Sequence, residues 1–245
     1  MTDHLLIAGA QRSGTTFLYG LLDRHPEIEM ARPLRPEPKF FLRVDASATR
    51  AAYDALFGAK PHARLRVEKS TSYMERGDVP ARAVALLPGV KAVFLLRDPI
   101  QRAISNYRLS VDHGAETASL EEAFRFENER RDAYDHARFS VSPFAYLARG
   151  HYYRLLQPWR QALGRNRMLL IPFERLIREP AVMQELFAWL EVGELDPVTT
   201  PHPINMSRAA VDVSAWLNRE LVEHFRESNR LLAQHYDFDI SLWQA

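Results

Sequence analysis

A short apolar segment followed by a glycine-containing loop constrains the fold of this chain more than any other feature. Residues His4 to Ala8 (HLLIA) form a continuous apolar run, which is typical of a strand buried on both faces of a sheet. The loop Gly9 to Thr16 follows directly. An amphipathic stretch from Thr15 to Arg24 then predicts a helix that ends before His25-Pro26. A buried strand, a loop and a helix are the opening of an α/β unit.

Apolar segments alternate with helical patterns along the rest of the chain. Further strands are predicted at Arg64–Val67, Lys91–Leu96 and Met168–Ile171. Helices are predicted at Ala46–Leu56, Pro80–Leu87, Pro99–Val111, Leu120–Arg131, Phe144–Leu163, Ala181–Leu190 and Ser214–Gln234. This alternation predicts an α/β fold, a P-loop-like three-layer sandwich in which helices flank a central parallel sheet. No repeat or linker divides the 245 residues, so we expect a single domain over residues 1–245.

The composition excludes several classes of function. Lys and Arg number 32 against 31 Asp and Glu, which argues against nucleic acid as a partner. The absence of cysteine excludes disulfides, thiol nucleophiles and Cys-ligated metals. No apolar run is long enough to span a membrane and the N-terminus does not resemble a signal peptide, so we expect a cytoplasmic protein. The nine histidines form no H-x-x-x-H or H-E-x-x-H pattern, so no metal site is predicted.

The first loop has the physical features of an anion site. Its glycines have the G-x-x-x-x-G spacing of a Walker A loop, but Thr15 follows where that motif has lysine. The cation is instead Arg12, inside the loop. Backbone N–H groups and the positive end of the helix dipole would face a phosphate-like group here. The alternative is a plain helix cap, because Ser13, Thr15 and Thr16 are all good capping residues.

A second candidate anion site follows the Lys91–Leu96 strand. Ligands of open α/β sheets bind beyond the carboxyl ends of the strands, which is where Arg97 lies. Ser105 falls within the first two turns of the helix that begins at Pro99, so a cation and a hydroxyl are available for an anion. The alternative is an Arg97 paired with a surface carboxylate and a Ser105 that is merely exposed.

Taken together, Q-R-S-G-T-T after the first strand and R-D-P-x-x-R-x-x-S-x-Y after a later one resemble the PAPS-dependent sulfotransferase family. These enzymes use 3′-phosphoadenosine-5′-phosphosulfate (PAPS) as sulfuryl donor and release the desulfated nucleotide PAP. The resemblance extends through the segments His25-Pro26, Pro36–Phe41, Val67–Tyr73 and, weakly, Gly150–Tyr152 and Met168–Pro180.

The resemblance implies roles for both loops. The residues that would hold the 5′-phosphosulfate are Arg12, Ser13, Gly14, Thr15 and Thr16. Arg97 and Ser105 would take the 3′-phosphate. Arg208, in the loop before the last predicted helix, would close over the nucleotide.

The resemblance also implies the catalytic groups. The segment E-P-K-F-F, Glu37 to Phe41, resembles the E-x-H-F-F segment of the heparan-type branch, in which the glutamate is the general base. Glu37 would then deprotonate the acceptor, while Arg12 and Lys69 stabilise the leaving phosphate. Lys39 replaces the histidine of that branch, and Phe40 and Phe41 are expected to be core anchors. No metal is required, because fixed cations do the electrostatic work.

The leading hypothesis is therefore in-line transfer of a sulfuryl group to a hydroxyl or amine of a carbohydrate or small-molecule acceptor. A P-loop kinase or nucleotide hydrolase is the alternative, opposed by the missing Walker lysine and by the lack of a strand-ending Mg²⁺ ligand, since Arg97 precedes Asp98. A non-catalytic module that keeps the nucleotide loops is a third hypothesis. The sequence identifies neither the acceptor nor the oligomeric state.

Overall fold

The computed structural model describes residues 3–43, 48–58, 60–132, 142–195 and 211–243. The chain forms two compact units, each with its own apolar core. Unit 1 comprises Met1–Leu96 and Gln157–Ile204, and unit 2 comprises Arg97–Leu156 and Asn205–Ala245. That residues 1–245 form one domain stays a prediction.

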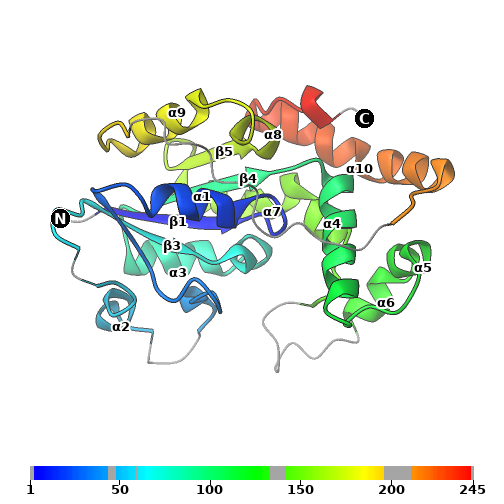
Figure 1. Ribbon diagram of the computed structural model, residues 1–245, viewed down its shortest axis with the longest axis horizontal. Coiled ribbons are helices and arrows are strands. Elements are labelled where there is room, and N and C mark those ends of the chain that lie inside the picture. The colour runs from blue at the N-terminus through cyan, green and yellow to red at the C-terminus, as the bar shows by residue number, and fades with distance from the viewer. Residues whose placement is uncertain (1–2, 44–47, 59, 133–141, 196–210, 244–245) are drawn as a thin grey trace. The chain divides into compact units, whose positions relative to one another are not determined.

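Unit 1 is built on a parallel sheet of five strands in the order β2-β3-β1-β4-β5 (Figure 1). The strands are β1 (Asp3–Gly9), β2 (Ile28–Met30), β3 (Leu65–Lys69), β4 (Lys91–Leu96) and β5 (Met168–Pro172). The predicted parallel sheet and its four predicted strands are confirmed. Only β2 was not predicted, because three residues are too few for a pattern to show.

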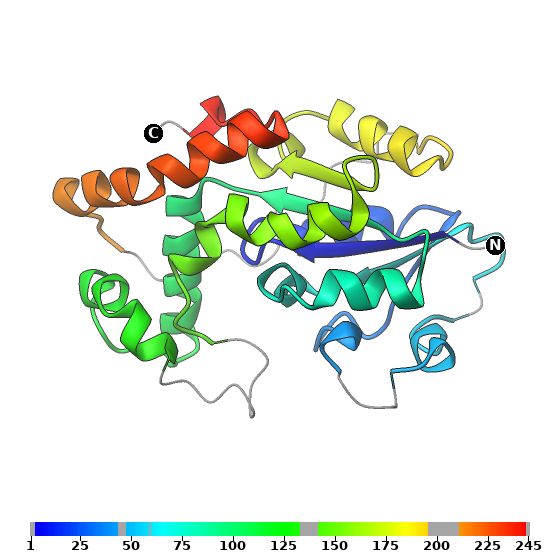
Figure 2. The same cartoon turned by 180° about the vertical axis from the view of Figure 1, so that it is seen from behind.

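Helices cover both faces of this sheet, as the views from front and back show (Figures 1 and 2). The helical elements of unit 1 are α1 (Thr15–Leu22), η1 (Phe40–Leu42), α2 (Arg50–Asp54), η2 (Thr71–Glu75), α3 (Val79–Leu86), the end of α7 (Tyr152–Leu163), α8 (Phe173–Leu176) and α9 (Ala181–Leu190). Successive residues of β4 point to opposite faces of the sheet. Val93 and Leu95 belong to the core formed with α1 and α9, whereas Phe94 packs edge-on against Trp159 of α7. The predicted three-layer α/β architecture is confirmed.

The direction in which successive strands are added to the sheet reverses at β1. From β1 the chain runs to β2 and β3 on one side and then crosses to β4 on the other side. Ligands of open α/β sheets bind at such reversal points, beyond the carboxyl ends of the strands. The loop that follows β1 therefore lies where a binding site is expected.

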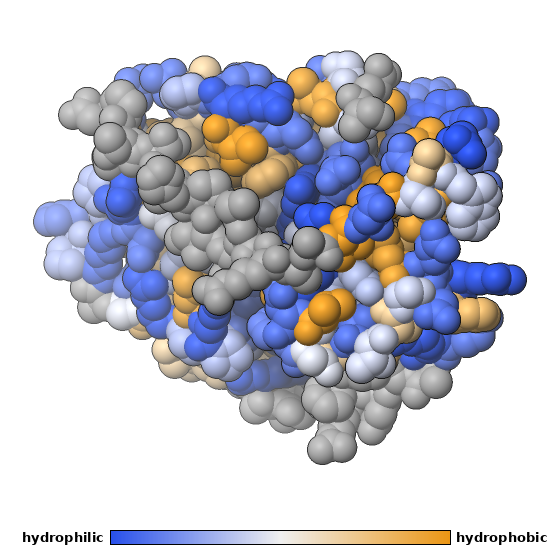
Figure 3. Space-filling model, turned by 45° about the vertical axis from the view of Figure 1, so that its right-hand side comes forward, coloured by the Kyte–Doolittle hydropathy of each residue, from blue (hydrophilic) through white to orange (hydrophobic). Residues whose placement is uncertain are grey.

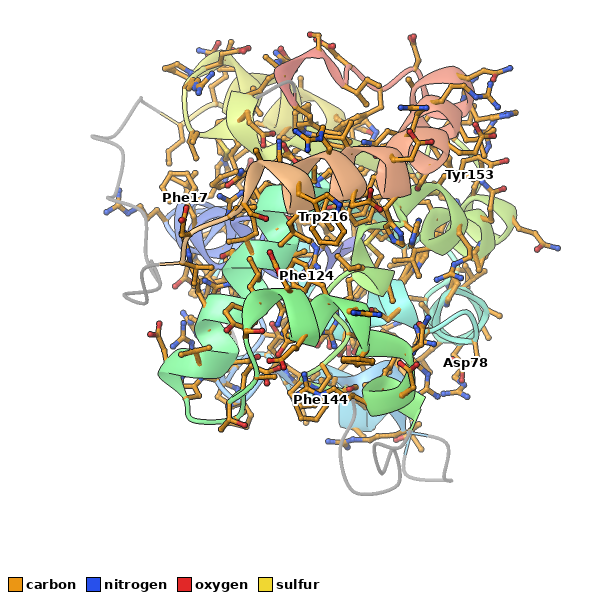
Figure 4. The ribbon with its side chains drawn as sticks, turned by 90° about the vertical axis from the view of Figure 1, so that its right-hand side faces the viewer. Phe17, Asp78, Phe124, Phe144, Tyr153 and Trp216 are labelled. Atoms are coloured by element: carbon orange, nitrogen blue, oxygen red, sulfur yellow. The ribbon has the colours of Figure 1, made fainter. Side chains whose placement is uncertain are left out.

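Unit 2 is helical. Its elements are α4 (Pro99–Asp112), α5 (Leu120–Arg125), α6 (Glu127–Asp132), η3 (Ala148–Gly150), the start of α7, α10 (Ala215–Tyr236) and η4 (Ser241–Trp243). Its core joins side chains of α4, α5 and α10, with Phe124 of α5 lying between α5 and α10 (Figure 4).

Two predicted helices of unit 2 have different limits. The helix expected over Leu120–Arg131 is divided into α5 and α6, and the one expected over Phe144–Leu163 begins only at Tyr152. Tertiary contacts engage the segment before α7: the Leu147 N–H donates to the Glu127 carboxylate, the Ala148 N–H donates to the same group at 2.8 Å, and a Cβ on Gly150 would lie 2.6 Å from the ring of Phe225. Tertiary packing therefore overrides the local helical pattern.

No helix within the described ranges is long and apolar enough to cross a membrane. Among the residues coloured in Figure 3, polar ones predominate and apolar ones appear in separate patches.

Candidate active site

The loop between β1 and α1 has the backbone of an anion-binding turn. Gly14 precedes the first residue of α1 with φ of 83°, and Arg12 has φ of 70°, so two residues of the loop are left-handed. Left-handed residues among right-handed ones turn successive N–H groups toward one point, next to the positive end of the helix dipole. The predicted strand–loop–helix is confirmed, with Thr15 as the first helical residue.

Two side-chain features bear on whether this loop can hold a phosphate or sulfate group. Ser13 is fully buried, and its Oγ has no hydrogen-bond partner among the described residues. A buried hydroxyl without a partner is costly, and an anion in the loop would supply one. A Cβ on Gly14 would lie 2.6 Å from the ring of Phe173, so the loop is closed from one side and only glycine fits there. Phe173 was not predicted, because its contact with the loop depends on the fold.

The structure brings Glu37 and Lys69 together. Lys69 Nζ donates to Glu37 Oε1 at 2.5 Å, and the Thr71 N–H donates to Oε2 at 2.9 Å. The Thr71 hydroxyl lies 3.1 Å from both carboxylate oxygens. The pair is largely shielded from water, since the Lys69 side chain is 5% exposed and that of Glu37 16%.

This pair lies beside the strand that leads into the phosphate loop. In the β1–β3 register Ile7 is opposite Lys69, and the Ser70 N–H donates to the Ile7 carbonyl at 3.2 Å. Gly9, where the loop begins, is packed against Met74 of η2 so closely that a Cβ would lie 2.7 Å from it. The carboxyl edge of the sheet therefore carries an anion loop, a lysine and a carboxylate within unit 1.

Sequence reasoning missed the groups that surround the pair. Glu68, Ser70 and Tyr73 are buried behind it, and Thr71 binds Glu37 directly. The available signal was an acidic residue, Glu68, next to Lys69 at the end of β3. Phe40 and Phe41, predicted as core anchors, are buried and pack against Tyr53 and each other.

The candidates at the start of α4 belong to unit 2. Arg97 and Ser105 are both half-buried. The Asp98 carboxylate caps the helix, accepting from the N–H groups of Ile100 at 2.8 Å and Gln101 at 3.3 Å. The Tyr152 hydroxyl donates to the Arg97 carbonyl at 2.8 Å, so the backbone that carries Arg97 is held in place. Asp98 thus has a capping role.

Arg208 lies outside the described residues. Within the part of the chain that the structure describes, no group of three or more His, Asp or Glu side chains could hold a metal ion. The two histidines His151 and His224 do meet in unit 2, with Nε2 atoms 3.0 Å apart, and partial burial lowers the pKa of His151 to about 4.

The fold defines the class of this protein: a P-loop-like α/β protein whose central strand leads into a glycine-containing loop at the start of a helix. Comparison with known proteins gives the family. The family model for the sulfotransferase domain matches residues 2–206, so the chain belongs to the sulfotransferase family.

Similar proteins carry related descriptions. Mouse heparan sulfate glucosamine 3-O-sulfotransferase 3A1 is 29% identical over 176 residues, 72% of this chain and 42% of that protein. A Caenorhabditis elegans bifunctional heparan sulfate N-deacetylase/N-sulfotransferase 1 is 26% identical over 197 residues, 78% of this chain and 22% of that protein. The chain thus spans less than half the length of these relatives.

Solved structures agree on the fold. A sulfotransferase from Alicyclobacillus acidocaldarius covers 100% of both chains with a TM-score of 0.80 and 25% identity. A mouse sulfotransferase complexed with PAP has a TM-score of 0.62 at 14% identity, covering 93% of this chain and 85% of that one.

Proposed function

We propose that this protein transfers the sulfuryl group of PAPS to a hydroxyl or amine of a carbohydrate or small-molecule acceptor, with Glu37 as general base. The observation that carries the proposal is the contact between Glu37 and Lys69 beside the anion loop of the same unit. The heparan sulfate relatives support a carbohydrate acceptor. A cytoplasmic location remains a prediction from the sequence.

Each proposed site residue of unit 1 has a chemical task. The Glu37 carboxylate accepts hydrogen bonds from Lys69 and Thr71, and its proposed task is to take the acceptor's proton. Lys69 and Arg12 supply positive charge for the phosphate oxygen that becomes the leaving group. Ser13 and the backbone N–H groups at Gly14 hold the 5′-phosphosulfate in line with the acceptor.

The remaining predicted site residues are assigned to the donor by the family resemblance. Thr15 and Thr16, at the start of α1, add hydroxyls to the 5′ side. Arg97 and Ser105 are proposed to bind the 3′-phosphate, as cation and hydroxyl, and Arg208 to close over the nucleotide. The donor supplies the activated sulfuryl group, and no metal is part of the proposal.

The kinase or hydrolase alternative has little support. The acid that follows β4, Asp98, is engaged in capping α4. Thr15 also stands where a Walker loop has its lysine.

Nucleotide binding is the first test. The chain is titrated calorimetrically with PAP, 5′-AMP and ATP–Mg, and its melting temperature is measured with each. At a hundredfold excess over the dissociation constant, a ligand that binds only the folded state stabilises it by about 2.7 kcal/mol. We expect strong stabilisation by PAP and little by 5′-AMP. Stabilisation by ATP–Mg alone would contradict the proposed donor.

The second test addresses the general base. Glu37→Gln is expected to bind PAP like the parent chain but to lose roughly 10²- to 10⁴-fold in turnover with PAPS and heparan sulfate, because the amide cannot take a proton. Glu185→Gln is the control, since that carboxylate lies on α9 and pairs with Arg175. A Glu37→Gln chain with full turnover would remove Glu37 from the role.

A further inference from the structure

Glu37 lies in a segment without regular secondary structure, so contacts with the rest of unit 1 must fix its position. Residues 31–39 form no helix or strand. Pro36 and Pro38 flank Glu37, and neither has an N–H group to donate. The three backbone N–H groups after Pro38 all donate to one buried network: those of Lys39 and Phe41 donate to side-chain hydroxyls, and that of Phe40 donates to the Glu68 carboxylate.

The two hydroxyls share one acceptor. The Lys39 N–H donates to Ser70 Oγ at 2.9 Å, and the Phe41 N–H donates to the Tyr73 hydroxyl at 2.9 Å. Ser70 in turn donates to Glu68 Oε1 at 2.8 Å, and the Tyr73 hydroxyl donates to the same oxygen. A hydroxyl has one proton and two lone pairs. With each proton directed to Glu68, the lone pairs face the backbone N–H groups.

The network is closed to water. Glu68, Ser70 and Tyr73 each have 0% exposure. Burial raises the pKa of Glu68 to about 7, with hydrogen bonds from Tyr73, Ser70 and the Phe40 N–H opposing the rise and the Glu37 charge adding to it. No solvent can replace a lost partner here, so the hydroxyls keep one orientation.

Backbone strain in the same place adds to the evidence. Lys39 has φ of 49°, a left-handed conformation that is unfavourable for a residue with a side chain. The hydrogen bond from the Lys39 N–H to Ser70 stabilises this conformation. The conformation of Lys39 in turn sets the direction of the backbone at Pro38 and Glu37.

We propose that Glu68 is a positioning residue for Glu37: by orienting the hydroxyls of Ser70 and Tyr73 it fixes the backbone that holds the Glu37 carboxylate against Lys69. This inference rests on the proposed role of Glu37 as base. It assigns to Glu68 an effect on geometry, and the acceptor oxygen matters more than the negative charge.

Two substitutions separate geometry from charge. Glu68→Gln keeps an acceptor oxygen for both hydroxyls and removes the charge, whereas Glu68→Leu removes the acceptor. We expect kcat with PAPS and heparan sulfate within about threefold of the parent for Glu68→Gln, and lowered by roughly tenfold to a hundredfold for Glu68→Leu, because small misplacements of a catalytic group are costly. PAP affinity is expected to stay within about twofold in both. Equal losses in the two variants, or no loss in Glu68→Leu, would overturn the proposal.

A tyrosine pair decides the question if Glu68→Leu does not fold. Tyr73→Phe deletes the hydroxyl that bridges Glu68 and Phe41. Tyr53→Phe is the matched control, because Tyr53 is equally buried in the same aromatic cluster and its hydroxyl has no partner among the described residues. We expect kcat to fall roughly threefold to tenfold for Tyr73→Phe alone. Equal kcat values in the two variants would overturn the proposal.

A spectroscopic readout keeps this test independent of the acceptor. The chain has four lysines, so ¹³Cε-labelled lysine gives four signals, and the one lost in Lys69→Arg identifies Lys69. The Lys69 signal is expected to move in Tyr73→Phe and Glu68→Leu toward its position in Glu37→Gln, and to stay in Glu68→Gln and Tyr53→Phe. An unmoved signal in Tyr73→Phe would refute positioning, whether or not turnover is observed. Full turnover of Glu37→Gln would instead refute only the proposed base.

Discussion

Replacing Gly14 with alanine tests the geometry of the anion loop directly. Gly14 has φ of +83°, and a Cβ there would lie 2.6 Å from two carbons of the Phe173 ring. The left-handed conformation costs a residue with a side chain roughly 1–2 kcal/mol. Forcing the ring aside adds about 1–3 kcal/mol, the usual cost of overpacking. We therefore expect Gly14→Ala to lower the free energy of unfolding by about 2–5 kcal/mol.

The assay is equilibrium unfolding in urea, followed by fluorescence, with PAP titration of the folded variant. Gly20→Ala is the control within the same helix, because nothing lies within 4 Å of a Cβ at Gly20. Alanine in a helix interior is better than glycine by about 0.5–1 kcal/mol, so this control is expected to be slightly more stable than the parent.

A double substitution separates the two costs. In Gly14→Ala/Phe173→Leu the smaller side chain relieves the overlap but leaves the backbone strain. The two changes are therefore expected to be non-additive, with a favourable coupling of about 1–3 kcal/mol. A Gly14→Ala chain as stable as the parent, or purely additive effects, would refute the packing of Phe173 on the loop.

Three further predictions concern charge and pH. The pKa of Glu68 is raised to about 7 in the folded protein from 4.5, so its favourable contribution to folding stability is complete below pH 4.5 and is lost as the pH rises through 7. Urea unfolding should therefore show Glu68→Gln gaining about 1–3 kcal/mol of stability relative to the parent between pH 5 and 8. Parallel stability curves of the two proteins would contradict this. The pKa of His151 is lowered to about 4 from 6.5, so its contribution to folding stability is complete above pH 6.5 and is lost on acidification. Between pH 7 and 5, the free energy of unfolding of His151→Gln should fall by roughly 1 kcal/mol less than that of the parent. An equal fall in both proteins would refute this prediction. Arg97→Ala should weaken PAP binding about tenfold to a hundredfold by calorimetry without changing the affinity for 5′-AMP, and an equal loss for both nucleotides would show that Arg97 does not read the 3′-phosphate.

Predictions from neighbouring residues agreed well with the structure. The apolar run of β4 and the amphipathic run of α9 have the predicted bounds, Lys91–Leu96 and Ala181–Leu190. Pro99 begins α4 as its position in the sequence indicates. These features depend on residues a few positions apart, so the sequence displays them directly.

Features that depend on distant residues were not predictable in this way. The contact of Gly150 with Phe225 before α7 and the contact of Gly14 with Phe173 at the loop both join residues far apart in the sequence. The motif resemblance selected Glu37 and Lys69, but their contact at 2.5 Å is a product of the fold.

The amino-acid sequence by itself determined the α/β alternation, the glycine-containing loop after the first strand and the candidate base. The first two depend on patterns of neighbouring residues, and the third depends on a short motif. Tertiary structure decided which groups hold that base. The Glu68 carboxyl, the hydroxyls of Ser70 and Tyr73 and the backbone around Glu37 come from segments about thirty residues apart, and only strand pairing and burial bring them into hydrogen-bond range. A buried hydrogen-bond network is specified by the whole fold, so its members show no pattern until the chain is folded.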